Sequence, residues 1–395
     1  MKHGSIIRVL VADDSALMRN LISRLLGRAP DILVAATARD GEDAVQKAIE
    51  LKPDVVTMDI NMPKLDGISA MQMILAEKIC PVIMLSSLTQ QGAVETFECL
   101  ELGAFDFVAK PEGTVSAKLD SIAEELISKV RAAAASGGLK RPRPKPAPLP
   151  PRSLVRPAAR PAVRPATLPL SEMRAIAIGI STGGPTTIST FLPGLPADLP
   201  AAIFLVQHMP AAFIPTYVSR LQKECAIEVV EAETGASVHA GCCYVASNNL
   251  HLCPYRKLSG EVVLRRPSQP KTLFVPGVGV MMDSVLSIYG ARTIGVLMTG
   301  IGDDGADQMV RIREAGGITI AESEESCVVF GMPYQAIARG GAEIVLPSWE
   351  IAARLVRILG ARTARDSEQR TSDRTSDRTS DRTSLRTSAR PGAGS

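Results

Sequence analysis

Residues 176–185 read IAIGISTGGP, an apolar run that passes directly into a serine, a threonine, two glycines and a proline. An apolar run bounded by glycine and proline is typical of a buried strand. The turn after it has three competing interpretations: a plain strand-to-helix connection, a phosphate cradle, or a nucleophile held where a substrate reaches it. The choice depends on the residues that end the other strands.

The same alternation of short apolar runs and amphipathic stretches recurs along the chain. The apolar runs that predict strands lie at residues 7–12, 32–36, 55–58, 82–85, 107–108, 175–178, 202–206, 243–245, 294–298, 318–320 and 343–345. Helical spacing lies between them, for example at Leu17, Leu21, Ile22 and Leu25 and in residues 309–315. Because strands that alternate with helices form parallel sheets covered on both faces, the sequence predicts an α/β protein with two doubly wound domains.

Two segments without this alternation divide the chain. Residues 136–169 hold ten prolines and eight Lys/Arg without an acidic residue. Proline at this density predicts a polyproline II spacer, and a ligand for a proline-recognition domain is the sharper alternative. A low-complexity Arg-Thr-Ser-Asp repeat near the C-terminus is expected to stay disordered. The predicted units are residues 5–131, a linker at 132–172, residues 173–360 and a tail at 361–395.

Composition and charge exclude several classes of function. The formal net charge is +3, but the proline-rich segment and the tail carry more positive charge than this, which leaves the remaining residues net acidic. A basic groove on a folded domain is therefore not expected. Aromatic residues make up only 4% of the chain, so a base-stacking surface is not expected either. The sequence thus predicts that no nucleic acid is bound.

The sequence also predicts a cytoplasmic protein that does not insert into a membrane. The N-terminus, MKHGSIIRVLVADDS, lacks the pattern of a signal peptide, and no stretch approaches 18 uninterrupted apolar residues. The seven cysteines contain no CxxC pair and sit mostly among apolar neighbours. Such cysteines are expected to be reduced, packed thiols.

Polar side chains end the strands predicted in the first domain. Asp13 and Asp14 follow the first apolar run, Asp59 follows the third, and Ser86 and Lys110 follow the fourth and fifth. In a parallel sheet these positions share one edge. Three acids there repel one another unless a cation lies among them, and Mg²⁺ prefers oxygen ligands. The Lys110 ammonium and the Ser86 hydroxyl are suited to the oxygens of a phosphoryl group on Asp59.

This arrangement resembles the receiver domain of two-component response regulators over residues 6–131. The resemblance implies a flavodoxin-like fold, phosphorylation of Asp59 by a histidine kinase, and a switch pair formed by Ser86 and Phe107. The Mg²⁺ ligands that it implies are Asp13, Asp14, Asp59 and the backbone carbonyl of Asn61. A phosphoryl group adds about two negative charges, which reorders the loops around it.

In the second domain the turn at 179–183 has the G-x-S-x-G pattern of a nucleophile elbow. A phosphate loop would end in Gly-Lys-Ser/Thr, but Pro185 follows the glycines here, and the Rossmann G-x-G-x-x-G spacing is absent. These departures favour a nucleophilic serine over a phosphate cradle.

An acyl-transfer serine requires a base and an acid that orients it. His208 ends the apolar run AAIFLVQH, so it is predicted at the same sheet edge as Ser181. Asp303 and Asp304 follow the run GVLMTG, and an acid there would orient the imidazole. The chain order is Ser, His, Asp, whereas an α/β-hydrolase runs Ser, acid, His. A triad here therefore belongs to a different doubly wound sheet.

The motifs STGGP, QHMP, TGIGDDGA and ESCVVFGMP, preceded by a receiver and a tether, resemble the chemotaxis protein-glutamate methylesterase/protein-glutamine deamidase family. The resemblance covers residues 5–131 and 173–358 and implies a Rossmann-like catalytic domain. It implies that Ser181 is the nucleophile, His208 the general base and acid, and Asp304 the orienting carboxylate. Thr182 and the backbone N–H of Ile301 would shape the site around the oxyanion.

The resemblance also implies the reaction. Glutamate γ-methyl esters on chemoreceptors would be hydrolysed with release of methanol, and receptor glutamines deamidated, without a cofactor for either reaction. A chemotaxis histidine kinase would phosphorylate the receiver, which otherwise restricts access to Ser181. The outcome would be sensory adaptation in chemotaxis.

One segment departs from the family pattern. Residues 275–279 are Val-Pro-Gly-Val-Gly where members commonly carry Arg-Pro-Ser-Val-Asp. This loss of polar groups favours an alternative in which the second domain only binds receptors or a kinase. Nucleotide binding at the glycine turn is a further alternative.

Overall fold

The structure, a computed structural model, describes residues 6–111, 116–136 and 172–360. The predicted linker at 132–172 is described only at residues 132–136 and 172, and the rest of it, like the repeat tail, lies outside the described residues. Among the described helices, none has the length and hydrophobicity needed to cross a lipid bilayer.

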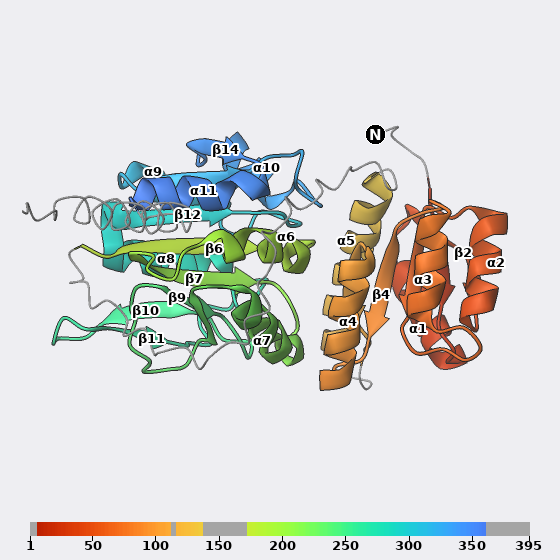
Figure 1. Ribbon diagram of the computed structural model, residues 1–395. Helices are drawn as coiled ribbons and strands as arrows, with labels where there is room; N and C mark the ends of the chain where they lie inside the picture. Colours follow the sequence, from red (N-terminus) through yellow and green to blue (C-terminus); the bar gives the residue numbers. More distant parts are fainter. Residues whose placement is uncertain (1–5, 112–115, 137–171, 361–395) are drawn as a thin grey trace, which may run out of the picture.

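The first domain contains a sheet of five parallel strands in the order β2-β1-β3-β4-β5 (Figure 1). The strands are β1 (Ile7–Ala12), β2 (Ile32–Ala38), β3 (Val55–Asp59), β4 (Val82–Ser86) and β5 (Asp106–Ala109). The helices are α1 (Ala16–Leu26), α2 (Gly41–Leu51), α3 (Gly67–Ala76), α4 (Gln90–Leu102) and α5 (Ser116–Ala135). The strand order reverses between β1 and β3, and open α/β sheets bind their ligands at such a point.

The second domain contains seven parallel strands in the order β14-β13-β12-β6-β7-β9-β8. These strands are β6 (Arg174–Ile180), β7 (Ala201–Gln207), β8 (Glu228–Glu231), β9 (Cys242–Val245), β12 (Thr293–Leu297), β13 (Ile318–Glu322) and β14 (Ile344–Leu346). A separate antiparallel hairpin is formed by β10 (Cys253–Arg256) and β11 (Val262–Arg265). Here the strand order reverses between β6 and β12.

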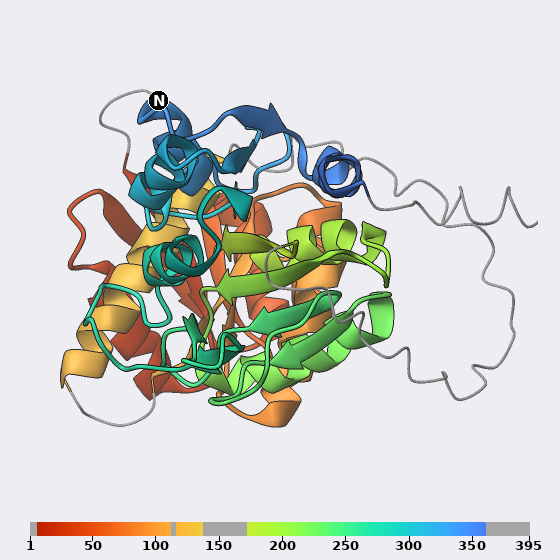
Figure 2. The same cartoon turned by 90° about the vertical axis from the view of Figure 1, so that its left-hand side faces the viewer.

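Helices cover both faces of the larger sheet (Figure 2). On one face lie α6 (Gly184–Phe191), α7 (Ile214–Glu224) and α11 (Ser348–Leu359). On the other lie α8 (Val278–Tyr289), α9 (Ala306–Glu314) and α10 (Met332–Ala338). Short 3₁₀ turns are η1 (Leu192–Gly194), η2 (Ala211–Phe213) and η3 (Gly290–Arg292). Because both faces are covered, β6, β7 and β12 are almost completely buried, as their apolar sequences predicted.

The predicted fold class, two doubly wound parallel-sheet domains, is confirmed. Sequence patterns missed β8, β10 and β11, which are four residues each. The strand β8 reads EVVE and carries glutamates at both ends, so it gives no continuous apolar run.

Aromatic side chains join the two domains. Phe213 of η2 lies with its ring centroid 4.8 Å from that of Phe107 on β5 and 6.4 Å from that of Phe97 on α4. Tyr217 of α7 stacks on Phe97 at 5.9 Å. At the rim of this contact Arg220 forms an ion pair with Glu101. Phe213 is fully buried, so the apolar cores of the two domains are continuous at this point.

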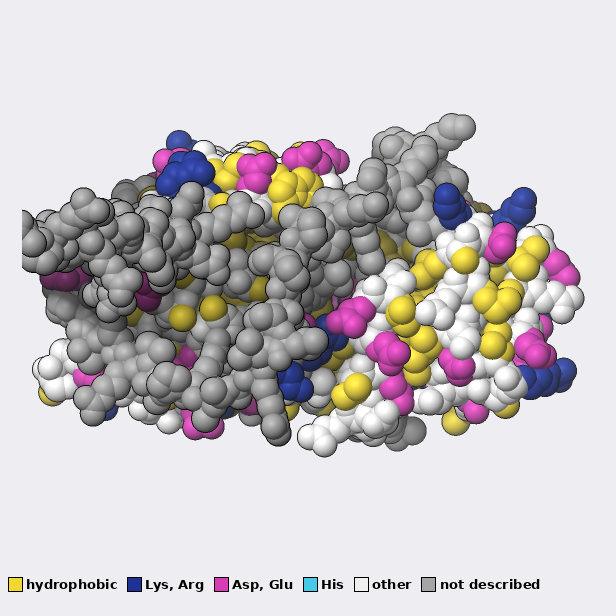
Figure 3. All heavy atoms as spheres, viewed as in Figure 1, with side chains coloured by type: hydrophobic (Ala, Val, Ile, Leu, Met, Phe, Trp, Pro, Cys, Tyr) yellow, Lys and Arg dark blue, Asp and Glu magenta, His cyan; other side chains and the backbone are white. Residues whose placement is uncertain are grey.

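Charge on the described surface is mixed. In the view of Figure 3, Lys and Arg side chains occur in small groups separated by acidic and apolar side chains. Within that view the described residues form no extended basic face, in agreement with the net acidic charge of the sequence outside the two basic segments.

Candidate functional sites

The three residues predicted as a triad follow three neighbouring strands. Ser181 comes directly after β6, His208 directly after β7, and Asp304 follows β12. The His208 N–H donates to the carbonyl of Ile180 (3.1 Å), which continues the register of β6 with β7. The Ser181 N–H donates to the carbonyl of Thr299 (2.9 Å), on the β12 side. The three positions therefore meet at the carboxyl edge of the sheet, where the strand order reverses.

The carboxylate of Asp304 orients His208. Its Oδ2 lies 3.0 Å from His208 Nε2 and accepts a hydrogen bond from the backbone N–H of Val278, and its Oδ1 accepts one from the N–H of Gly279 (2.8 Å each). Burial alone raises the pKa of Asp304, but the hydrogen bonds from His208, Gly279 and Val278 outweigh burial and lower it. The carboxylate of Asp304 therefore stays ionised at neutral pH.

The structure distinguishes Asp304 from its neighbour Asp303. Asp303 forms an ion pair with Arg339 (2.5 Å) and its side chain is 60% exposed, so it takes no part in orienting His208. Of these two acids, the one that hydrogen-bonds His208 is Asp304, the second of the pair.

The segment at 275–279 contacts the Asp304 carboxylate through backbone N–H groups rather than through side chains. The amides of Val278 and Gly279 belong to the first turn of α8, where N–H groups lack partners within the helix. Both N–H groups bind the Asp304 carboxylate, and the helix dipole favours a negative charge there. The departure from Arg-Pro-Ser-Val-Asp therefore leaves the backbone anchor of the acid intact.

His208 presents one nitrogen without a partner. Its Nε2 is taken by Asp304, and its buried Nδ1 has no hydrogen bond among the described residues. Ser181 Oγ likewise makes no hydrogen bond with the His208 imidazole in the described residues. Catalytic hydrogen bonds often tighten only when substrate binds. The Nδ1 atom is thus the position from which the imidazole would accept the Ser181 proton.

Phe274 was not predicted as part of the site. Its ring stacks on the His208 imidazole, with centroids 4.3 Å apart and an interplanar angle of 17°. It lies in the loop before α8, which has no periodic pattern, so its sequence gave no signal. The stacked ring restricts rotation of the imidazole.

The two glycines after Ser181 are required by close packing. Gly183 has a φ of +75°, and a Cβ there would lie 2.4 Å from the side chain of Val328. A Cβ on Gly184 would lie 2.0 Å from the Gln207 amide oxygen. The Gln207 amide in turn donates to the carbonyls of Ser181 (2.9 Å) and His208 (3.1 Å). The glycines therefore let neighbouring segments support the serine turn.

Thr299 is a second residue that sequence patterns missed. Its buried hydroxyl donates to the carbonyl of Thr182 (2.9 Å) and accepts from the N–H of Val329 (2.9 Å). Its own N–H donates to the buried carboxylate of Glu322 (2.8 Å). Thr299 therefore fixes the backbone on both sides of the serine.

Two backbone N–H groups near Ser181, those of Thr182 and Ile301, have no hydrogen-bond acceptor among the described residues. Both are therefore suited to bind an oxyanion.

Thr299→Val is expected to lower the free energy of unfolding by about 1–3 kcal/mol, because the buried Thr182 carbonyl and the part-buried Val329 N–H both lose the hydroxyl as a partner. The turnover number for ester hydrolysis should also fall, because the turn that carries Ser181 loses the hydrogen bond between Thr299 and the Thr182 carbonyl. Thr293→Val is the matched control: Thr293 is equally buried, but its hydroxyl has no partner among the described residues. Urea unfolding and ester hydrolysis of both variants test this. Equal effects of the two substitutions would contradict the role of Thr299.

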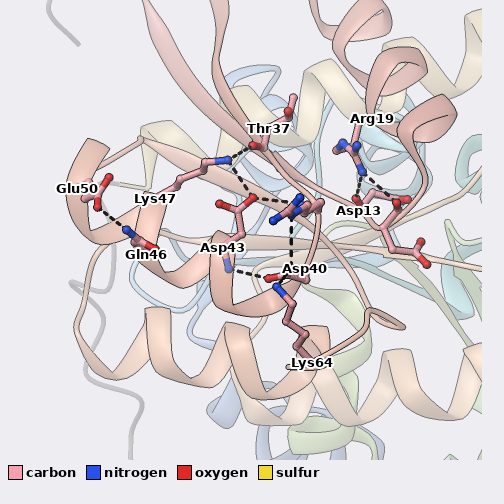
Figure 4. Close-up of polar contacts among 11 residues, drawn as sticks. Asp13, Arg19, Thr37, Asp40, Asp43, Gln46, Lys47, Glu50 and Lys64 are labelled. Atoms are coloured by element: carbon pink, nitrogen blue, oxygen red, sulfur yellow. Dashed lines mark hydrogen bonds and ion pairs between the residues drawn. The ribbon is translucent and has the colours of Figure 1, made fainter.

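The acidic cluster of the first domain also forms as predicted. Lys110 Nζ lies 2.8 Å from Asp13 and 2.7 Å from Asp59, and carboxylate oxygens of Asp13, Asp14 and Asp59 lie within 4.8 Å of one another. The pKa of Asp59 is raised, mainly because the carboxyl is buried. The ammonium of Lys110 lowers this pKa, but burial and the charge of Asp13 outweigh it. Figure 4 shows Arg19 directed at this turn, where it donates to the carbonyls of Asp13 (2.8 Å) and Asp14 (3.0 Å). This set of oxygen donors fits Mg²⁺.

The other residues predicted for this domain lie around the cluster. Ser86 Oγ accepts from Thr96 (2.6 Å) and lies 3.2 Å from the carbonyl of Gly92, both on α4. Phe107 is buried against Phe213 of the second domain. The Asn61 side chain lies 3.4 Å from Glu95. Of the predicted switch pair, Ser86 therefore contacts α4, and Phe107 forms part of the contact between the domains.

A receiver-type acidic edge joined to a hydrolase-type α/β domain defines the class of response regulators with an effector domain. In agreement, residues 9–119 match the response regulator receiver domain and residues 176–355 match the CheB methylesterase family.

The chain is 55% identical over 354 residues to protein-glutamate methylesterase/protein-glutamine glutaminase 3 of Syntrophomonas wolfei, covering 89% of this chain and 99% of the relative. It is 45% identical over 370 residues to the protein of the same description from Caldanaerobacter subterraneus, covering 92% and 99%. The crystal structure of the Thermotoga maritima CheB methylesterase catalytic domain is 37% identical, with a TM-score of 0.46, and covers 47% of this chain and 98% of that one. The chain belongs to the protein-glutamate methylesterase/protein-glutamine glutaminase family.

Proposed function

We propose that this protein hydrolyses glutamate γ-methyl esters on chemoreceptors and deamidates receptor glutamines, through Ser181, His208 and Asp304. The observation that carries the proposal is the His208–Asp304 hydrogen bond next to Ser181, at the edge where three neighbouring strands end. The relatives carry both activities in their names. Action in the cytoplasm, sensory adaptation and the division into units at 5–131, 132–172, 173–360 and 361–395 belong to the same proposal.

The chemistry follows the acyl-enzyme route. Ser181 Oγ attacks the γ-carbonyl carbon while His208 Nδ1 accepts its proton, and the imidazolium is stabilised by Asp304. The tetrahedral intermediate collapses as His208 returns the proton to the leaving methoxide or amine, which releases methanol or ammonia. Water, deprotonated by His208, then cleaves the acyl-enzyme and frees the glutamate. No cofactor takes part in these steps.

The N–H groups of Thr182 and Ile301 are the proposed oxyanion donors. Both lie in turns fixed by Thr299, whose backbone and hydroxyl bond to both sides of the serine. Preorganised donors matter because removing one typically costs about 2.7–4 kcal/mol of transition-state stabilisation.

Control by phosphorylation is the second part of the proposal. A chemotaxis histidine kinase would phosphorylate Asp59, with Asp13, Asp14, Asp59 and the Asn61 carbonyl holding Mg²⁺, which neutralises the charge of the incoming phosphoryl group. The α4 helix contacts α6, η2 and α7, the elements that follow Ser181 and His208. Phe107 and Phe213 therefore connect the phosphorylation edge to the effector domain, and an unphosphorylated receiver would restrict access to Ser181.

Asp59→Asn should keep the basal rate of ester hydrolysis and lose its increase with a small-molecule phosphodonor and Mg²⁺. The reason is that the amide cannot accept a phosphoryl group. Asp54→Asn is a matched control, since Asp54 precedes the same strand but lies outside the acidic cluster. Methanol release with and without phosphodonor measures both, and stimulation of the Asp59→Asn protein would contradict the assignment.

A further inference from the structure

A cluster of three different metal-ligand side chains lies on the second domain, away from both proposed sites. Glu228 and Cys242 are the first residues of β8 and β9 and are register partners in the parallel pair at one end of the sheet. His239 lies in the loop before β9. The ligand atoms of the three side chains lie within 4.8 Å of one another, and His239 Nε2 is 3.6 Å from Glu228 Oε2.

Backbone hydrogen bonds hold the cluster in place. The N–H of His239 donates to Tyr244 Oη (3.0 Å), and the Tyr244 hydroxyl donates to the carbonyl of Ser237 (3.0 Å). His239 Nδ1 lies 3.2 Å from the carbonyl of Ala240, so a proton on Nδ1 leaves Nε2 with its lone pair toward Glu228. Metal-binding histidines typically donate their second ring N–H to such a carbonyl. The imidazole is therefore already oriented as a ligand.

The three donor types, a carboxylate, an imidazole and a thiol, indicate which metal ion the cluster would bind. A thiolate and an imidazole are poor ligands for Mg²⁺ or Ca²⁺ but good ones for Zn²⁺. Zinc binds sulfur at about 2.3 Å and nitrogen or oxygen at about 2.0–2.2 Å, so tetrahedral ligand atoms lie between about 3 and 4 Å apart. The cluster needs only a small contraction to reach this geometry. We propose that Glu228, His239 and Cys242 bind Zn²⁺, with water as the fourth ligand.

The location indicates what the metal would do. Glu228 and Cys242 begin parallel strands, whereas Ser181 and His208 follow the ends of strands, so the cluster lies at the opposite edge of the sheet. Burial raises the pKa of Cys242 to about 12, and zinc would have to displace the thiol proton on binding. Zinc bound there would clamp the outer strand β8 to β9. It should stabilise the fold and leave ester hydrolysis unchanged, so failure of this proposal is distinguishable from failure of the proposed function.

The test uses the full-length protein, stripped with a chelator and kept in excess Mg²⁺ so that the acidic cluster of the receiver is occupied. Calorimetric titration with Zn²⁺ should give one equivalent, and Co²⁺ should give a thiolate-to-metal charge-transfer band. His239→Ala and Glu228→Gln should weaken Zn²⁺ binding at least tenfold and abolish the rise in Tm with zinc. Both residues are partly exposed, so these variants should fold.

Cys242→Ser should remove the charge-transfer band, and Cys253→Ser, at a half-buried cysteine outside the cluster, should retain it. Absence of the band in the unmodified protein, or Zn²⁺ binding that is unchanged by His239→Ala and Glu228→Gln, would overturn the proposal. In that case Glu228 and His239 form only a surface ion pair.

Discussion

Asp304→Asn is expected to lower kcat for methyl-ester hydrolysis by about 10⁴-fold, as expected when the orienting acid of such a triad loses its charge. In the native site Oδ1 accepts from Gly279, while Oδ2 accepts from both Val278 and His208. An asparagine has one carbonyl oxygen for these three donors. Its NH₂ group would face His208 Nε2 and place the imidazole proton on Nδ1, where the base is needed.

The adjacent acid supplies the control for this experiment. Asp303 is largely exposed and paired with Arg339, so Asp303→Asn should change kcat by less than about threefold, as for a surface ion pair. Methanol release from methylated receptor membranes measures both variants. Equal losses in the two, or a loss below tenfold in Asp304→Asn, would contradict the assignment of Asp304.

Ser181→Ala is expected to reduce kcat on the order of 10⁶-fold, because removing the nucleophile of a triad costs nearly as much as removing all three members. The hydroxyl is the only atom of the proposed triad that bonds to substrate carbon. Substrate binding should survive, since a serine-to-alanine change adds no bulk at this half-buried position. Ser189→Ala is a matched control in the helix after the turn, where, within the described part of the chain, the hydroxyl bonds only to the carbonyl of Pro185 (3.2 Å).

Methanol release from the same membranes, together with a receptor pull-down, separates catalysis from binding for these serine variants. A Ser181→Ala protein that still releases methanol at more than a hundredth of the native rate would mean that another group attacks the ester. Loss of activity in Ser189→Ala would show that the helix, and not the nucleophile, is the sensitive element.

The fold could be predicted because its strands are buried on both faces. Runs such as residues 202–206 are continuous and apolar, and β7 extends this run by one residue at each end, over Ala201–Gln207. The missed strand β8 lies at the end of the sheet, where a strand needs only one neighbour and can carry glutamates at its ends. Local sequence does not reveal such a strand, because its pairing with β9 is a long-range contact.

The positions of Ser181, His208 and Asp304 could be predicted because residues after parallel strands meet at one edge. The sequence could not predict which imidazole nitrogen faces Asp304. That depends on where α8 lies, because the first backbone N–H groups of this helix hold the carboxylate in place. Phe274 and Thr299 act through contacts with residues far away in sequence. The aromatic contact of Phe213 with Phe107 likewise depends on how the two domains pack. None of these has a local sequence pattern.

The most direct test of the triad is labelling of the full-length protein with a fluorophosphonate, followed by peptide mass spectrometry. The label should be found on Ser181, its rate should fall steeply in His208→Ala and Asp304→Asn, and Asp303→Asn should label like the native protein. A native protein that is not labelled at Ser181, or is labelled there equally fast without His208, would contradict the catalytic assignment.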